Sequence, residues 1–247
     1  MKSNIKLQTW FIESENSKEN ERLFIFHHAG GGASYYMPLL DYLSSYFNIY
    51  LIQLPGREHR IKESPYNDLE QLLSDLETVL LPYLDSSFIF LGHSMGAMIA
   101  FELAHRLKEL YGKKPRHLFL SAMRAPHLSK EEKYRHLPDE QLLSKVFDLG
   151  GTQQELSNDK KLVSLILPTL RKDLELCDNY QYRRNIKLNV PVTILGGHKD
   201  KVVSIHDLLA WDSYFEDKFN VCVFKGGHFY FKDCFELLSS TLIKESL

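Results

Sequence analysis

The stretch from Phe88 to Ala97 (FIFLGHSMGA) constrains the fold more than any other part of the chain. Four apolar residues that suit a buried strand run directly into a Gly92-x-Ser94-x-Gly96 pattern, and a helical pattern with small residues follows at once. A tight turn from strand to helix forces its central serine into a strained backbone conformation, and the flanking glycines keep the neighbouring backbones from clashing. The sequence therefore predicts a strand, a turn and a helix, with the Ser94 hydroxyl lifted clear of a sheet.

Apolar runs and helical patterns alternate along most of the chain. Strands are expected at 22–27, 47–54, 88–91, 117–122, 191–195 and 221–224. Helices are expected at 35–43 with Ser34 as N-cap, at 68–84, from 97 onward, at 205–214 and at 232–243. A short edge strand is expected at 8–12, followed by a polar turn region at 13–20. Such alternation predicts an α/β fold with a mostly parallel central sheet and helices on both faces.

The alternation stops between residues 124 and 187, where the chain has helical patterns with polar faces and Pro or Gly punctuation. One pattern covers 138–149, and a second begins at Ser157 and runs toward Tyr182. An insertion of this kind between two strands suggests a lid over the active face, with extra structural packing as the alternative. We expect residues 1–247 to form a single domain with a helical lid insertion at about 124–187.

Composition excludes several classes of function. The formal net charge of -2 gives no field suited to nucleic acid or to an anionic membrane. Three cysteines without a C-x-x-C pair fit a reducing compartment, and no apolar stretch approaches the ~20 residues of a transmembrane helix. The amino-terminal residues also lack the apolar region of a signal peptide. We therefore expect a cytoplasmic monomer that binds neither nucleic acid nor membrane.

Three reactive residues follow strands of the expected sheet. Ser94 follows the strand at 88–91, Asp200 lies in the loop after the strand at 191–195, and His228 follows the last strand. Catalytic groups of an open parallel sheet collect at the carboxyl ends of its strands. The order Ser, Asp, His along the chain is the order of the α/β-hydrolase fold.

Each of these residue types has a chemical role. A serine hydroxyl is a poor nucleophile until a base removes its proton, and a neutral imidazole, here His228, is suited to that task. A carboxylate on the other ring nitrogen fixes the tautomer and stabilises the imidazolium, which is the role expected of Asp200. Asp178 and Asp207 remain alternatives for the acid.

The tetrahedral intermediate of acyl transfer also needs hydrogen-bond donors. They are expected to be the backbone N–H of Met95, directly after the nucleophile, and that of Ala29, in the glycine-rich loop at 28–32. The rival use of such a loop, a phosphate cradle, lacks the G-x-x-x-x-G-K-[ST] pattern. His27 and His28 are adjacent and no H-E-x-x-H occurs, so we expect no metal.

The chain resembles the type II thioesterases, discrete α/β-hydrolases that accompany polyketide, nonribosomal-peptide and fatty-acid synthases. The family often has Pro where this chain has His27, and Ser where it has Gly32. The resemblance covers nearly the whole length and is carried by six segments: 26–34 (FHHAGGGAS), 54–58 (LPGRE), 92–97 (GHSMGA), 167–180 (LPTLRKDLELCDNY), 196–200 and 226–229.

The resemblance implies a substrate and a partner. The substrate is an acyl group in thioester linkage to the phosphopantetheine arm of an acyl or peptidyl carrier protein, and the enzyme edits stalled chains or releases product. The chain itself needs no cofactor. The apolar residues of the lid either form a chamber for the acyl group or belong to the core; they are Leu142, Val146, Phe147, Leu165, Ile166 and Leu170. A general carboxylesterase or lipase, and a non-catalytic binding module on the same fold, are the alternatives.

Overall fold

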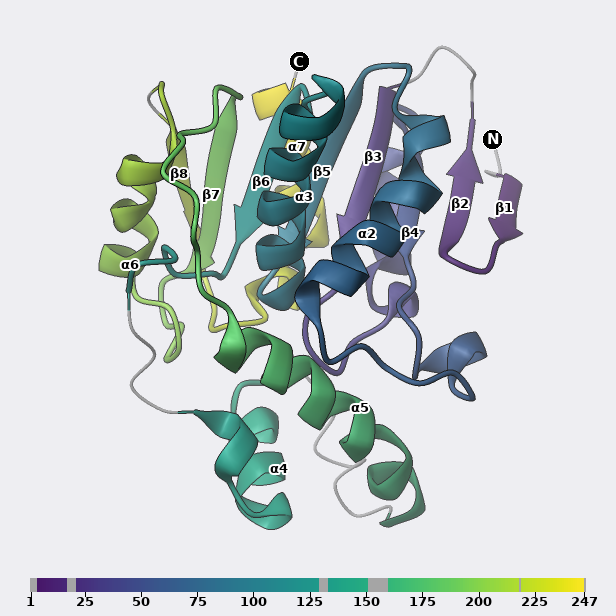
Figure 1. The fold of residues 1–247 in the computed structure, drawn as a ribbon, viewed down its shortest axis with the longest axis vertical. Helices are drawn as coiled ribbons and strands as arrows, with labels where there is room; N and C mark the ends of the chain where they lie inside the picture. The colour runs from purple at the N-terminus through teal and green to yellow at the C-terminus, as the bar shows by residue number, and fades with distance from the viewer. Residues whose placement is uncertain (1–3, 17–20, 129–132, 151–159, 218, 247) are drawn as a thin grey trace.

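A computed structural model describes residues 4–16, 21–128, 133–150, 160–217 and 219–246. In these residues eight strands form one sheet in the order β1-β2-β4-β3-β5-β6-β7-β8 (Figure 1). The strands from β3 to β8 pair in parallel, while β1 and β2 are antiparallel. Their bounds are β1 Asn4–Leu7, β2 Phe11–Glu15, β3 Glu21–Phe26, β4 Phe47–Ile52, β5 Phe88–His93, β6 His117–Ser121, β7 Val192–Gly197 and β8 Asn220–Phe224. The expected mostly parallel sheet is confirmed.

Helices cover both faces of this sheet, as the alternation of patterns predicts. Side chains of α2, α3 and α6 share one apolar cluster, whereas those of α1 and α7 share the other (Figure 1). Within the described ranges, no helix is both long enough and apolar enough to cross a bilayer. The α-helices are α1 Leu40–Leu43, α2 Leu69–Leu80, α3 Met95–Tyr111, α4 Asp139–Asp148, α5 Lys160–Asn179, α6 Ile205–Leu209 and α7 Phe235–Ser246.

The amino-terminal prediction was wrong in its details. The edge strand expected at 8–12 is a hairpin, because β1 pairs with β2 and β2 continues through Glu15 into the expected turn region. Glu13 lies opposite Tyr50 of β4 and is almost fully buried. Burial is the main cause that raises the pKa of its carboxyl. Pairing with a neighbouring strand outweighs the low strand preference of charged residues, and the local sequence pattern does not reveal that pairing.

The prediction of an α-helix at 35–43 with Ser34 as its N-cap was also wrong. The segment Ala33–Leu39 is a 3-10 helix, η1, and only the last turn, α1, is α-helical. Pro38 lies inside η1, and a proline removes an N–H group and clashes with the preceding turn of an α-helix. The hydroxyl of Ser34 does not cap this helix and instead donates to Glu58 Oε1 at 2.6 Å.

Three other expected helices each divide into an α-helix and a 3-10 segment. The helix expected at 68–84 divides into α2 and η3 Leu81–Tyr83, and the one at 205–214 divides into α6 and η6 Ala210–Tyr214. The closing helix at 232–243 becomes η7 Tyr230–Asp233 followed by α7.

The insertion between β6 and β7 contains α4, α5 and the short 3-10 helix η4 Tyr134–His136. Both α-helices lie beyond the carboxyl ends of the strands (Figure 1). The helical pattern expected from Ser157 begins outside the described residues, and α5 is described from residue 160.

Two buried histidines away from the expected site make the stability depend on pH. His105 lies on α3 and His117 begins β6. Burial is the main cause that lowers the pKa of His105 to about 3 and that of His117 to about 4. Both rings titrate near ~6.5 in an unfolded chain, so below that pH the unfolded state binds more protons.

We expect the free energy of unfolding to hold its full value above about pH 6.5 and to fall as the pH drops toward the folded pKa values, by about 1 to 2 kcal/mol per histidine at pH ~5. His117→Gln removes one titrating ring and keeps a partner for the Thr193 hydroxyl, which lies 2.9 Å from His117 Nε2. Urea unfolding of wild type and of His117→Gln, each at a pH above about 6.5 and at pH ~5, measures the loss in the free energy of unfolding. Equal losses in wild type and variant would contradict it.

Candidate active site

Ser94 occupies the turn between β5 and α3. Its φ of 55° and ψ of -115° lie in a region that residues other than glycine rarely adopt. A Cβ on Gly92 would collide with the Gly96 carbonyl, and one on Gly96 would collide with the carbonyl of Phe26 on β3. Both glycines are therefore needed for the close approach of β5, β3 and α3 that holds Ser94 in this conformation.

His228 and Asp200 meet beyond the ends of the last two strands. The loop after β7 carries Asp200 and the loop after β8 carries His228, and His228 Nδ1 lies 2.8 Å from Asp200 Oδ2. The other carboxylate oxygen, Oδ1, accepts the backbone N–H groups of Val202 at 2.8 Å and Val203 at 3.1 Å. Because both oxygens are engaged, the carboxylate has a fixed orientation toward the imidazole.

The two alternative acids lie elsewhere. Asp207 forms the capping box of α6: its Oδ2 accepts from the Ser204 N–H at 2.8 Å, and the Ser204 hydroxyl accepts from the Asp207 N–H at 3.2 Å. Asp178 lies near the carboxyl end of α5. Of the three acids, Asp200 is the one hydrogen-bonded to His228.

Aromatic rings pack against one another between the turn of Ser94, the loop of His228 and the glycine-rich loop. The ring of His93, directly before Ser94, lies 5.3 Å from that of His228 and 6.0 Å from that of His28. Phe229, directly after His228, lies 4.7 Å from His28. The turn with Ser94, the loop with His228 and the glycine-rich loop after β3 are therefore neighbours, as their places after parallel strands predict.

His28 and His93 are buried beside His228. Burial is the main cause that lowers the pKa of both rings well below the ordinary value, and the charge of a protonated His228 adds to it. Each ring therefore stays neutral at neutral pH. His93 Nδ1 lies 2.8 Å from the Ser121 hydroxyl, which in turn lies 2.7 Å from the hydroxyl of Tyr230.

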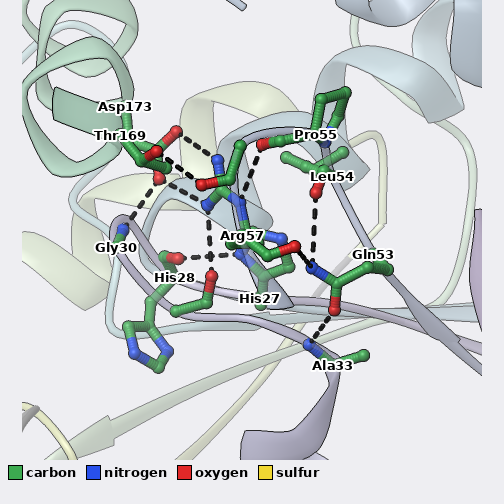
Figure 2. Close-up of polar contacts among 12 residues, drawn as sticks. His27, His28, Gly30, Ala33, Gln53, Leu54, Pro55, Arg57, Thr169 and Asp173 are labelled. Carbon is green, nitrogen blue, oxygen red and sulfur yellow. Dashed lines mark hydrogen bonds and ion pairs between the residues drawn. The ribbon is translucent and has the colours of Figure 1, made fainter. Parts of the chain in front are cut away.

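The glycine-rich loop after β3 forms a tight turn in which several backbone groups are hydrogen-bonded (Figure 2). The carbonyl of His28 accepts the N–H of Gly31 at 3.0 Å and the Nδ1–H of the neutral His27 ring at 2.9 Å. The N–H of Gly30 donates to Asp173 Oδ2 on α5 at 2.7 Å. Ala29 lies between these two fixed peptide groups.

A buried ion pair beside this loop was missed by the sequence reasoning. Arg57, after β4, and Asp173 of α5 form a bidentate ion pair, with Nη1–Oδ2 at 2.6 Å and Nη2–Oδ1 at 2.9 Å (Figure 2). Their side chains are only 7% and 2% exposed. The signal was present, because both residues lie in segments that resemble the type II thioesterases, but no pattern along the chain pairs charges so far apart.

A small cavity of about 30 Å³ lies where α4 and α5 approach the glycine-rich loop. Its lining includes four of the lid residues expected to form an acyl chamber: Val146, Phe147, Ile166 and Leu170. It also includes His28, Ala29, Gly30, Tyr35, Leu143 and Phe229. Of the other two, Leu142 is buried in a cluster with Leu170 and Leu174, and Leu165 is 53% exposed.

Comparisons with known proteins show the family of the chain. The thioesterase domain family matches residues 21–244. The gramicidin S biosynthesis protein GrsT of Aneurinibacillus migulanus is 36% identical over 227 residues, which cover 91% of this chain and 89% of GrsT.

Among solved structures, the type II thioesterase BorB from the borrelidin biosynthetic cluster superposes with a TM-score of 0.90 at 30% identity, covering 99% of this chain and 100% of BorB. YbtT, a type II thioesterase of the yersiniabactin pathway solved as a serine-to-alanine variant, has a TM-score of 0.80 at 27% identity and 94% coverage of each chain. The match over most of the chain, together with the confirmed α/β-hydrolase architecture, shows that the chain belongs to the thioesterase domain family.

Proposed function

We propose that the chain is a type II thioesterase that hydrolyses acyl thioesters from the phosphopantetheine arm of a carrier protein. Ser94 is the nucleophile, His228 the base and Asp200 the acid that orients it. The observation that carries the proposal is the 2.8 Å hydrogen bond between His228 and Asp200, in a loop packed beside the strained turn of Ser94.

The proposed reaction follows from these positions. Because His228 Nδ1–H donates to Asp200, the neutral ring keeps its lone pair on Nε2, which takes the proton from the Ser94 hydroxyl. The oxygen of Ser94 attacks the thioester carbon, and the tetrahedral intermediate collapses as the carbon–sulfur bond breaks. Thiols of the cysteine type have a pKa of ~8.5, so the thiolate is a good leaving group, and it takes up the proton that His228 received from Ser94. His228 then activates water, which cleaves the acyl-Ser94 ester without a cofactor of this chain.

Backbone N–H groups would stabilise the oxyanion of that intermediate. Met95 begins α3, and the first N–H groups of a helix have no acceptor within it. In the glycine-rich loop, the N–H groups of Gly30 and Gly31 are already engaged. The N–H of Ala29 has no acceptor among the described residues, which supports Ala29 as the second donor.

The relatives support the substrate class. GrsT is named for gramicidin S biosynthesis, and BorB and YbtT are described as type II thioesterases of biosynthetic pathways. We infer that this chain likewise serves a polyketide or nonribosomal-peptide synthase, by removing stalled acyl groups or releasing product from the carrier. A monomer with all the proposed groups on one chain suffices for this reaction.

We also infer that the segment at 124–187 acts as a lid on the single domain. Its helices α4 and α5 supply apolar side chains to the cavity beside Ala29. A cavity of about 30 Å³ has room for about one water-sized group, so a longer acyl chain requires the two helices to shift.

The proposal is tested by comparing kcat/KM for acyl-carrier protein, the same acyl group on coenzyme A, and simple oxygen esters. We expect the carrier-bound thioester to be the best substrate by at least about tenfold, because contacts with the carrier add binding energy that is retained in the transition state. Preference for oxygen esters would favour a carboxylesterase or lipase. Failure of a fluorophosphonate probe to label Ser94 would favour a binding module.

A further inference from the structure

The proposed triad leaves two of the family-like segments without a role, 54–58 and 167–180. The structure joins them through Arg57 and Asp173, whose side chains are almost fully removed from solvent. Burying two charges is costly unless they are paired and their remaining hydrogen-bonding groups are satisfied. The partners that satisfy this pair therefore indicate what the pair holds in place.

One of those partners is the Pro55 carbonyl, which accepts from Arg57 Nε at 3.1 Å, and the other two belong to the glycine-rich loop. Asp173 Oδ2 accepts the N–H of Gly30 at 2.7 Å, and Arg57 Nη1 donates to the carbonyl of Gly31 at 3.1 Å (Figure 2). Gly30 has a φ of 72°, a backbone conformation that glycine adopts without strain. The ion pair thus forms hydrogen bonds to two successive residues of the turn, to Gly30 through the carboxylate and to Gly31 through the guanidinium.

These hydrogen bonds help to fix the direction of the N–H group of Ala29. A peptide group is planar and trans, so the N–H of Ala29 points opposite to the carbonyl of His28. That carbonyl is held by Gly31, and the peptide on the other side of Ala29 is held by Asp173 through Gly30. Loss of the Asp173 contact frees the second peptide to rotate, which displaces Gly30 and Gly31. The bond from the Gly31 N–H to the His28 carbonyl is then weakened, and the peptide that carries the Ala29 N–H loses part of its support.

We propose that Asp173, held in place by Arg57, is a positioning residue that aims the Ala29 N–H at the oxyanion. This inference rests on the proposed function and adds to it. A donor stabilises the oxyanion only if it already points at the oxygen when the charge develops. Asp173 therefore acts through Ala29 and touches neither the substrate nor Ser94.

The helix that carries Asp173, α5, contacts the neighbouring loops through a second side chain. Thr169, one turn earlier on the same helix, donates its hydroxyl to the Gly56 carbonyl at 2.6 Å. Two side chains of α5 are thus fastened to the loops after β3 and β4. The organisation of the oxyanion site depends on where this helix of the insertion packs.

Two variants test the proposal, and the first of them removes both charges of the pair together, so that neither is left buried and unpaired. In the double variant Arg57→Met/Asp173→Leu, apolar side chains of similar size replace the pair, an exchange that many proteins tolerate. We expect kcat to fall about 10- to 100-fold, somewhat less than the loss of a whole oxyanion donor, with KM changed by less than about threefold. Asp173→Asn keeps an acceptor for Gly30 but leaves the Arg57 guanidinium without a carboxylate. It should therefore unfold at lower urea concentration than wild type, while the folded variant retains most of the kcat.

Affinity for an alkyl boronic acid separates positioning from stability. The Ser94 oxygen adds to boron, and the tetrahedral adduct places an oxygen in the oxyanion site. We expect the double variant to bind the boronate about 10- to 100-fold more weakly, and to bind an acyl-carrier analogue with an amide in place of the thioester as wild type does. Unchanged boronate affinity would overturn the proposal.

Arg60→Met is the matched control. Arg60 is also buried after β4, but its guanidinium pairs with Glu63 and the Gln53 carbonyl. This variant should keep wild-type kcat and boronate affinity, and a loss of kcat equal to that of the double variant would overturn the proposal. Wild type without activity on carrier thioesters would refute the proposed function instead, while the boronate comparison still tests the positioning role.

Discussion

Ser94→Ala is expected to lower kcat for acyl-carrier hydrolysis by about 10⁴- to 10⁶-fold, because the variant lacks the oxygen that attacks the thioester. Binding of the acyl-carrier should be nearly unchanged, since the hydroxyl is small and the surrounding contacts remain. Single-turnover kinetics with radiolabelled acyl-carrier measures the loss, and isothermal titration calorimetry measures binding. The wild type should accumulate label on Ser94, whereas the variant should acquire none.

The matched control is Ser34→Ala. Ser34 lies in the family-like segment at 26–34, is exposed and donates its hydroxyl to Glu58. This variant should retain nearly full activity. Alanine at position 94 keeps the same backbone conformation, with a φ of 55°, so the unfolding midpoint of Ser94→Ala should stay close to that of wild type. Substantial residual turnover in Ser94→Ala would mean that another residue is the nucleophile.

The parts of the fold that the sequence predicts are those set by short-range signals. The apolar run of β5 and the glycines around Ser94 specify strand, turn and helix locally, and the structure accounts for Gly92 and Gly96 through close approaches of the backbone. The same reasoning places Asp200 and His228 after neighbouring strands, and parallel pairing of β7 and β8 brings the two loops together.

Features set by distant contacts escape such reasoning. Arg57 and Asp173 are 116 positions apart, and each charge alone is typical of an exposed residue. Glu13 looked like part of a polar turn because nothing nearby indicates that β4 pairs with it. His27 gains its role from the carbonyl of His28, which only the folded loop presents. In each case the partner in space decides the structure.

Asp200→Asn is expected to lower kcat by about 10⁴-fold while leaving the fold intact. The geometry gives the reason. Asp200 Oδ1 accepts two backbone N–H groups, from Val202 and Val203, so the amide oxygen of asparagine must take that place. The amide nitrogen then faces His228 Nδ1 and donates to it. The imidazole is forced to carry its proton on Nε2, where it cannot accept the proton of Ser94.

Asp207→Asn is the matched control, because the amide oxygen of asparagine can accept the Ser204 N–H in place of Asp207 Oδ2, and α6 should keep its start. Steady-state kinetics and unfolding curves of both variants separate loss of catalysis from loss of stability. If Asp207→Asn or Asp178→Asn lost the four orders of magnitude and Asp200→Asn did not, the acid would be wrongly assigned. Loss in Asp200→Asn alone, with rapid labelling of Ser94 abolished and the unfolding midpoint retained, would tie the reactivity of Ser94 to the tautomer that the Asp200 carboxylate holds on His228.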